Sequence, residues 1–256
     1  MNTNYYSLAF EGDFFTIAAD IRHSGPDLLF FIHGLGGSKD AFHHIWERDD
    51  FAEYSVLAVD LVGFGESDKP GGFSYKMEAQ AQVAAELLAE FPDRKLHVIG
   101  HSMGGAVALL FPAEILNSIE TFANVEGNLI GADCQLGSRG MVSVPPDVFA
   151  DEMWPELRAK YSGLAPGYSA LDSTTADVMY RSAESLVSWS DSDKLLDAFG
   201  ALACRKAYFY GSENAAHPTV ARVGSIPKVE IKRSGHILMC DNPEDFYDEL
   251  HKFVTP

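Results

Sequence analysis

The stretch Gly100-His101-Ser102-Met103-Gly104-Gly105 lies between two mainly apolar segments, residues 96–99 and 106–111. This order predicts a strand, a sharp turn and a helix, with the serine at the turn. The backbone of a serine in a G-x-S-x-G turn is strained, and the flanking residues are glycines because larger side chains would collide there. The strain exposes the Ser102 hydroxyl. It also places the Met103 amide at a helix N-terminus, where an N–H can stabilise an oxyanion.

Two further motifs accompany this turn. The loop His33-Gly34-Leu35-Gly36-Gly37 closes an earlier apolar strand, and Ser234-Gly235-His236 follows the last one. With these three motifs the chain resembles the α/β-hydrolase superfamily over nearly its whole length outside roughly residues 128–199. The resemblance implies an α/β fold, with a mostly parallel central sheet flanked by helices. It also implies a hydrolase core of residues 1–127 and 200–256 and a mainly helical cap insertion of residues 128–199.

Composition limits the partners and the compartment. The 256 residues are enough for one domain with a full core. The 19 basic and 37 acidic residues give a net charge of −18, which disfavours nucleic acid and anionic membranes as partners. The three cysteines have no metal or redox spacing. The first residues given lack the basic start and long apolar run expected of a signal peptide, and no apolar run reaches membrane-spanning length. We expect a cytoplasmic protein that acts on a small molecule without metal or cofactor.

The order of apolar segments predicts alternating strands and helices. Residues 4–10 and 14–21 are expected to form a hairpin, and the continuous apolar run 28–32 a buried central strand. Helices are expected over residues 74–90 and 243–253, from their apolar spacing and proline boundaries. The other expected strands are residues 55–60, 119–125, 207–211 and 229–232.

A serine hydroxyl is a weak nucleophile at neutral pH, so a base must accept its proton during attack on a carbonyl. His236 is the candidate base, because it follows the last strand and precedes the final helix, where the superfamily places its histidine. The resemblance also implies that the amides of Leu35 and Met103 form the oxyanion hole. His33 and His101 are expected to have structural roles.

The triad acid has two candidates. Many members of the superfamily have an aspartate three residues beyond the glycine that ends the penultimate strand, and counting from Gly211 leads here to Asn214. An amide cannot supply the negative charge that stabilises an imidazolium. Glu126 is the preferred acid, because it ends the strand after the nucleophile helix and some superfamily members take their acid from that strand end. Glu213 is the alternative.

The nucleophile limits the chemistry. Epoxide hydrolases and haloalkane dehalogenases need a carboxylate at the turn, where this chain has Ser102. The sequence therefore predicts a serine hydrolase that cleaves a carboxylic ester of a small to medium apolar substrate through an acyl-enzyme. Two alternatives stay within the enzyme class, a C–C bond hydrolase and a lactonase with the same triad. A third is a non-catalytic ligand-binding protein on this fold.

Specificity is expected to lie in the insertion, whose large apolar side chains would give a pocket an adaptable lining. Trp154, Met179 and Trp189 are the candidates for contact with substrate. The wider set of such residues also includes Met141, Met153, Tyr161 and Tyr168.

Overall fold

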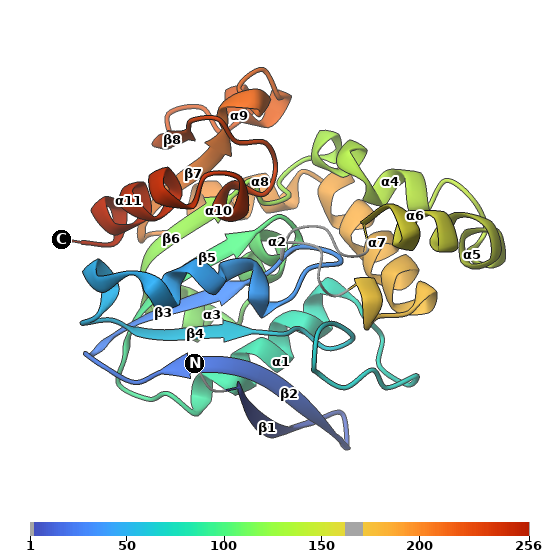
Figure 1. The fold of residues 1–256 in the computed structure, drawn as a ribbon, viewed down its shortest axis with the longest axis horizontal. Helices are drawn as coiled ribbons and strands as arrows, with labels where there is room; N and C mark the ends of the chain where they lie inside the picture. Colours follow the sequence, from blue (N-terminus) through green and yellow to red (C-terminus); the bar gives the residue numbers. More distant parts are fainter. Residues whose placement is uncertain (1–2, 162–170, 256) are drawn as a thin grey trace.

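The computed structural model describes residues 3–161 and 171–255. An eight-stranded sheet of order β1-β2-β4-β3-β5-β6-β7-β8 crosses the molecule (Figure 1). β1 is antiparallel to β2 and β2 to β4, whereas the remaining neighbours are parallel. The strands are β1 (Thr3–Phe10), β2 (Asp13–Arg22), β3 (Asp27–Ile32), β4 (Ser55–Val59), β5 (Lys95–His101), β6 (Ile119–Val125), β7 (Arg205–Gly211) and β8 (Lys228–Ile231).

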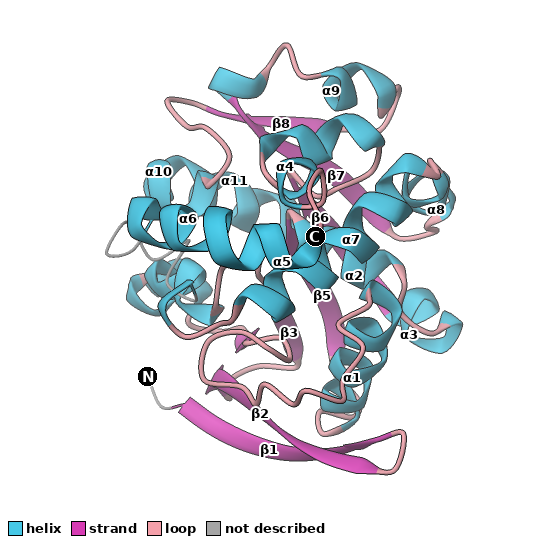
Figure 2. Cartoon of the chain, turned by 90° about the vertical axis from the view of Figure 1, so that its right-hand side faces the viewer, coloured by secondary structure: helices cyan, strands magenta, loops and turns pink. Residues whose placement is uncertain are grey.

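Helices cover both faces of the sheet, with α1, α2 and α3 on one side and α10 and α11 on the other (Figure 2). Outside the stretch between β6 and β7, the helices and helical turns are η1 (Lys39–Glu47), η2 (Asp49–Phe51), α1 (Met77–Ala89), α2 (Met103–Leu109), α3 (Ala113–Ser118), η6 (Ser212–Asn214), α9 (Pro218–Arg222), α10 (Leu238–Asp241) and α11 (Pro243–Val254). The predicted α/β class, with a mostly parallel sheet between two layers of helices, is therefore confirmed.

The core follows from the alternation of side chains along the strands. In β3, Phe30 belongs to the apolar cluster that includes residues of α1 and α2. Its neighbour Phe31 belongs to the cluster on the other face, with residues of η1 and α11. Both side chains are fully buried, which explains why residues 28–32 are apolar without interruption.

A run of helices interrupts the alternation between β6 and β7, and we call its described residues, 131–161 and 171–201, the helical segment. It lies beyond the carboxyl ends of the parallel strands (Figure 1). Its elements are η3 (Gly131–Leu136), α4 (Ser138–Met141), α5 (Pro146–Val148), η4 (Phe149–Met153), α6 (Trp154–Tyr161), α7 (Ala176–Asp191) and α8 (Lys194–Ala201). A continuous helical run begins at Pro146 and passes through η4 and Trp154 to Tyr161.

The predicted start of the first long helix is wrong. The helix expected from residue 74 begins only at Met77, because Tyr75 has φ 54°, a left-handed conformation that a helix cannot contain. In the part of the chain that the structure describes, no helix combines the length and the apolar character that a membrane span requires.

Candidate active site

Ser102 occupies a strained turn between β5 and α2. Its backbone angles are φ 51° and ψ −120°, outside the regions that a non-glycine residue commonly adopts. A Cβ atom at Gly100 would lie 2.7 Å from the Cα of Gly105, and one at Gly104 would collide with the carbonyl oxygen of Ile32. The glycines of the motif therefore let the helix start directly against β3 and β5.

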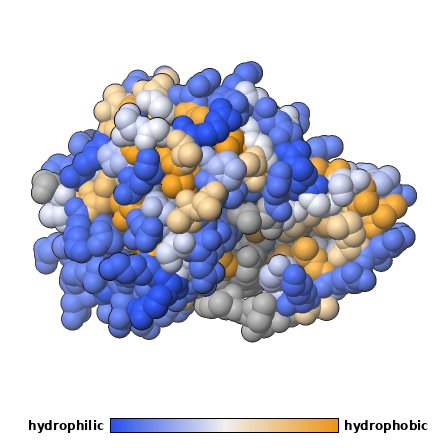
Figure 3. Space-filling view, turned by 90° about the horizontal axis from the view of Figure 1, so that it is seen from above, coloured by the Kyte–Doolittle hydropathy of each residue, from blue (hydrophilic) through white to orange (hydrophobic). Residues whose placement is uncertain are grey.

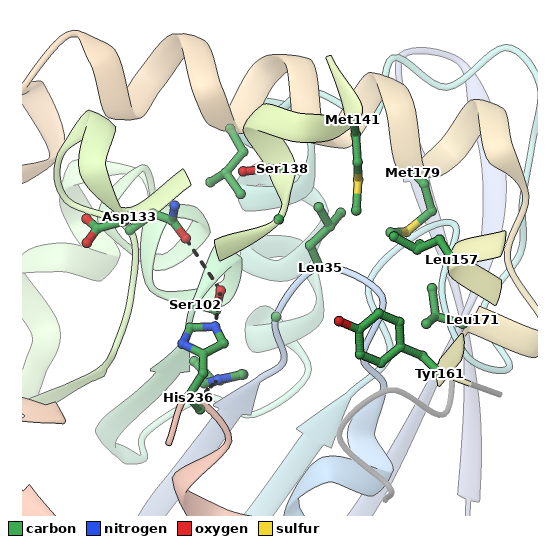
Figure 4. Close-up of a pocket in the computed structure, with 15 residues that line it drawn as sticks. Leu35, Ser102, Asp133, Ser138, Met141, Leu157, Tyr161, Leu171, Met179 and His236 are labelled. Carbon is green, nitrogen blue, oxygen red and sulfur yellow. Dashed lines mark hydrogen bonds between the residues drawn. The ribbon is translucent and has the colours of Figure 1, made fainter. Parts of the chain in front are cut away.

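His236 lies between the serine and a carboxylate. Its Nε2 is 3.1 Å from Oγ of Ser102 (Figure 4). Its Nδ1 is 2.8 Å from Oε2 of Glu126. The backbone of His236 is held by His101, whose Nε2 donates to the His236 carbonyl at 2.9 Å. Burial lowers the pKa of His101 to about 3, so its imidazole is neutral at pH 7 and carries its proton on Nε2.

Glu126 is a buried carboxylate at the end of β6, with φ 42°. Its Oε1 accepts hydrogen bonds from the Gly211 amide at 2.8 Å and from Nδ2 of Asn214 at 3.0 Å. Its Oε2 accepts from the same Nδ2 at 2.8 Å and faces His236. These donors satisfy the buried charge and fix the orientation of the carboxylate.

Glu213, the alternative acid, is exposed and joins the fold through its backbone, which donates to the Ser234 carbonyl at 3.1 Å. Within the described residues, its carboxylate has no hydrogen bond to His236. The structure thus brings Ser102, His236 and Glu126 together and places Glu213 outside this chain of hydrogen bonds.

Of the two residues whose amides are expected to bind an oxyanion, Met103 begins α2 and Leu35 lies in the loop after β3. Because Met103 is the first residue of α2, its N–H has no acceptor within the helix. Leu35 and Ser102 both line the cavity described below. His33 holds this loop in place: its Nδ1 donates to the Gly34 carbonyl at 2.7 Å, and its Nε2 accepts from the Leu61 amide at 3.0 Å. Burial lowers the pKa of His33 to about 4, so it stays neutral.

A cavity of about 100 Å³ opens above Ser102, between the sheet edge and the helical segment. Polar side chains lie near the serine, whereas the far part is apolar (Figure 4). The polar lining includes Asn128, Asp133 and Ser138. The apolar lining includes Met141, Leu157, Leu171, Met179 and Leu186, with Tyr161 beside them.

Of the three candidate substrate contacts, Met179 lines this cavity and the two tryptophans do not. Trp154 packs against Phe149, with ring centroids 6.2 Å apart. Trp189 lies under Nζ of Lys194, at 6.0 Å, on the outside of α7. Apolar side chains also reach the outer surface of the helical segment (Figure 3). Tyr168 lies outside the described residues.

Asn128, Asp133 and Ser138 are polar cavity residues that the sequence motifs did not identify. Asn128 ends the Glu126-Gly127-Asn128 turn at the carboxyl edge of the sheet. Ligands often bind at this edge, so the position of Asn128 after a strand was the sequence feature that could have identified it. Asp133 is buried and accepts from the amides of Leu129 and Ile130, at 2.7 and 2.8 Å, and from the Thr219 hydroxyl. Burial raises its pKa. Its bonds point to a structural role for Asp133.

The sequence of this chain matches a known protein family. A model of the alpha/beta hydrolase fold family matches residues 27–198. The chain belongs to this family.

Across residues 3–161 and 171–255, no three His, Cys, Asp or Glu side chains are grouped so that they could hold a metal ion.

Individual α/β hydrolases match the chain in sequence or in structure. Lipase 1 of Psychrobacter immobilis is 38% identical over 111 residues, which are 43% of this chain and 34% of that lipase. The matched stretch spans about a third of the length of such curated relatives. A thermophilic esterase from Thermogutta terrifontis superposes with a TM-score of 0.77 at 20% identity, covering 99% of this chain and 98% of that one. The N-acyl homoserine lactonase AidH gives a TM-score of 0.77 at 18% identity, covering 99% and 96%. At these identities the superpositions show the fold.

Proposed function

We propose that this α/β hydrolase is a serine hydrolase that cleaves carboxylic esters with small to medium apolar acyl groups. The observation that carries the proposal is the continuous hydrogen-bonded chain from Glu126 through His236 to Ser102. A nucleophile within reach of a base, with the base oriented by a buried acid, is the arrangement that acyl transfer requires.

In the proposed reaction, Ser102 Oγ attacks the ester carbonyl while Nε2 of His236 takes its proton. Glu126 stabilises the imidazolium that forms and keeps the neutral imidazole in the tautomer with its proton on Nδ1. The amides of Leu35 and Met103 would donate to the tetrahedral oxyanion. His236 then protonates the leaving alcohol, and the acyl group stays on Ser102 until a water activated by His236 releases the acid.

The substrate class follows from the cavity. Its apolar part would take an acyl chain, because burial of methylene groups against Met and Leu side chains stabilises binding. Within this proposal, residues 128–199 act as a cap over a small-molecule substrate. The relatives named as a lipase and an esterase act on the same bond type. A lactone is a cyclic ester that the same groups could open, and a structurally similar protein is named as a lactonase.

The test is hydrolysis of p-nitrophenyl esters of increasing acyl length by the wild type and by Ser102→Ala, with γ-lactones in parallel. We expect turnover to peak at one acyl length and to disappear in Ser102→Ala. Activity on diketone-type substrates without ester hydrolysis would instead favour C–C bond cleavage. No turnover of any substrate, together with a Ser102 that does not react with organophosphonates, would contradict the proposal and favour a ligand-binding protein.

A further inference from the structure

Asn128 lies directly beside the nucleophile and is 3% exposed. Its backbone N–H donates to the Ser102 carbonyl at 3.2 Å, which fixes the residue against the strained turn. Its side chain reaches the cavity, with Oδ1 3.5 Å from Ser102 Oγ and Nδ2 3.5 Å from Sγ of Cys134. A buried amide therefore lies next to the atom that would form the acyl bond.

The side chain of Asn128 uses little of its capacity for hydrogen bonding. The Ser102 hydroxyl has one proton, and His236 Nε2 is both the nearer acceptor, at 3.1 Å, and the more basic one. When the proton points to His236, Oδ1 of Asn128 has no donor among the described residues. A thiol sulfur is only a weak acceptor for Nδ2. A buried carbonyl oxygen without a donor is unfavourable, so this position is suited to a donor on a bound molecule.

The position of Oδ1 limits where that donor can be. The scissile carbonyl carbon must approach Ser102 Oγ, and a substituent on the next carbon of the acyl group would lie within hydrogen-bonding reach of an atom 3.5 Å from Oγ. Groups farther along the acyl chain would lie among Met141, Met179 and the leucines of the cavity. A polar group there would be buried without a partner.

Building on the proposed ester hydrolysis, we propose that Asn128 is a specificity residue. Its Oδ1 accepts a hydrogen bond from an O–H or N–H on the carbon next to the scissile carbonyl. The preferred substrates are then esters or lactones of 2-hydroxy or 2-acylamino acids with an otherwise apolar chain. A substrate without the donor leaves the buried Oδ1 unsatisfied, and sites of this kind discriminate strongly against the analogue that lacks the group.

The experiment compares the methyl esters of 2-hydroxyhexanoic and 2-fluorohexanoic acid, each as single enantiomers. Fluorine is similar to hydroxyl in size and withdraws electrons but cannot donate. Each kcat/KM is divided by the rate of hydroxide-catalysed hydrolysis of the same ester, which removes intrinsic reactivity. We expect one enantiomer of the hydroxy ester to be favoured by about tenfold or more. The ester of 2-acetamidohexanoic acid and its N-methyl derivative give the same comparison for an N–H donor.

Variants then locate the contact. Asn128→Leu removes the acceptor at similar size and should bring the hydroxy-to-fluoro ratio close to one. Asn128→Asp keeps acceptor oxygens and should retain the ratio. Ser138→Ala is the matched control, because it changes another polar cavity residue whose hydroxyl already donates to the Cys134 carbonyl at 3.4 Å, and it should also retain the ratio.

The outcomes distinguish failure of the Asn128 role from failure of the proposed ester hydrolysis. A wild-type ratio near one for both donor types, or an unchanged ratio in Asn128→Leu, overturns the role of Asn128 while ester hydrolysis stands. If none of these esters and no p-nitrophenyl ester is hydrolysed, the proposed function fails and this inference fails with it. If circular dichroism shows that Asn128→Leu does not fold, the wild-type ratio and the retained ratio of Asn128→Asp carry the test.

Discussion

Asn214 donates its side-chain amide to both carboxylate oxygens of Glu126, at 3.0 and 2.8 Å. The position three residues beyond Gly211, which carries an aspartate in many superfamily members, therefore holds a neutral donor here. The carboxylate that is hydrogen-bonded to His236 lies instead at the end of the neighbouring strand β6, where Asn214 contacts both of its oxygens. From this arrangement we predict how activity responds to substitutions at both positions.

Replacing the proposed acid should remove most activity without unfolding the protein. Glu126→Gln keeps the shape of the side chain but loses the charge that stabilises the imidazolium, so kcat should fall by about 10⁴-fold. Glu213→Gln is the matched control and should change kcat by less than about twofold, since its carboxylate is exposed. Steady-state kinetics with circular dichroism as a folding check would measure both, and the reverse pattern would identify Glu213 as the acid.

An aspartate introduced at position 214 should partly replace the carboxylate that Glu126→Gln removes. In the double variant Glu126→Gln/Asn214→Asp the donor and the acceptor exchange places, and kcat should recover by at least about tenfold over Glu126→Gln. Asn214→Asp alone puts two carboxylates within hydrogen-bond distance. Their repulsion should displace the Glu126 carboxylate from His236, so kcat should fall below that of the wild type. A wild-type kcat in Asn214→Asp would refute this coupling.

Buried neutral histidines should make stability depend on pH. The folded-state pKa of His101 is about 3, below the ordinary value of 6.5, so the unfolded chain binds the extra proton as pH falls. The contribution of His101 to the free energy of unfolding is therefore complete above about pH 6.5. It decreases by on the order of a few kcal/mol as the pH falls toward about 3. His101→Gln keeps a donor for the His236 carbonyl but does not titrate. Urea unfolding should show that the difference in unfolding free energy between the wild type and His101→Gln becomes smaller from pH 7 to pH 5. An equal difference at both pH values would argue against this role of His101.

The apolar end of the cavity should set acyl length. Met179 is 1% exposed and lines the cavity, so Met179→Ala should shift the preferred p-nitrophenyl ester to a longer acyl chain. The same change should cost about 2–5 kcal/mol of unfolding free energy, because it deletes buried atoms. Trp189→Leu serves as the control, since Trp189 lies outside this cavity. An unchanged acyl preference in Met179→Ala would place the acyl chain elsewhere.

Local geometric rules explain what the sequence could predict. The turn at Ser102 needs glycine at both flanking positions, and the run 28–32 needs burial on both faces, so these patterns have few alternative structures. The helical segment could be recognised only as an interruption of the alternation. Helical spacing does not reveal which side of α7 faces a cavity, so Met179 and Trp189 could not be told apart. Contacts between side chains far apart in the sequence, such as Asn214 with Glu126, have no sequence signal at all.

Activation of Ser102 by His236 and Glu126 can be measured by labelling the protein with a fluorophosphonate and following the rate by intact-mass spectrometry. We expect a single adduct that peptide mapping places on Ser102. Labelling should be lost in Ser102→Ala and slowed by orders of magnitude in His236→Ala and Glu126→Gln, with Glu213→Gln equal to the wild type. An unlabelled wild type, an adduct on another residue, or a rate independent of His236 would contradict it.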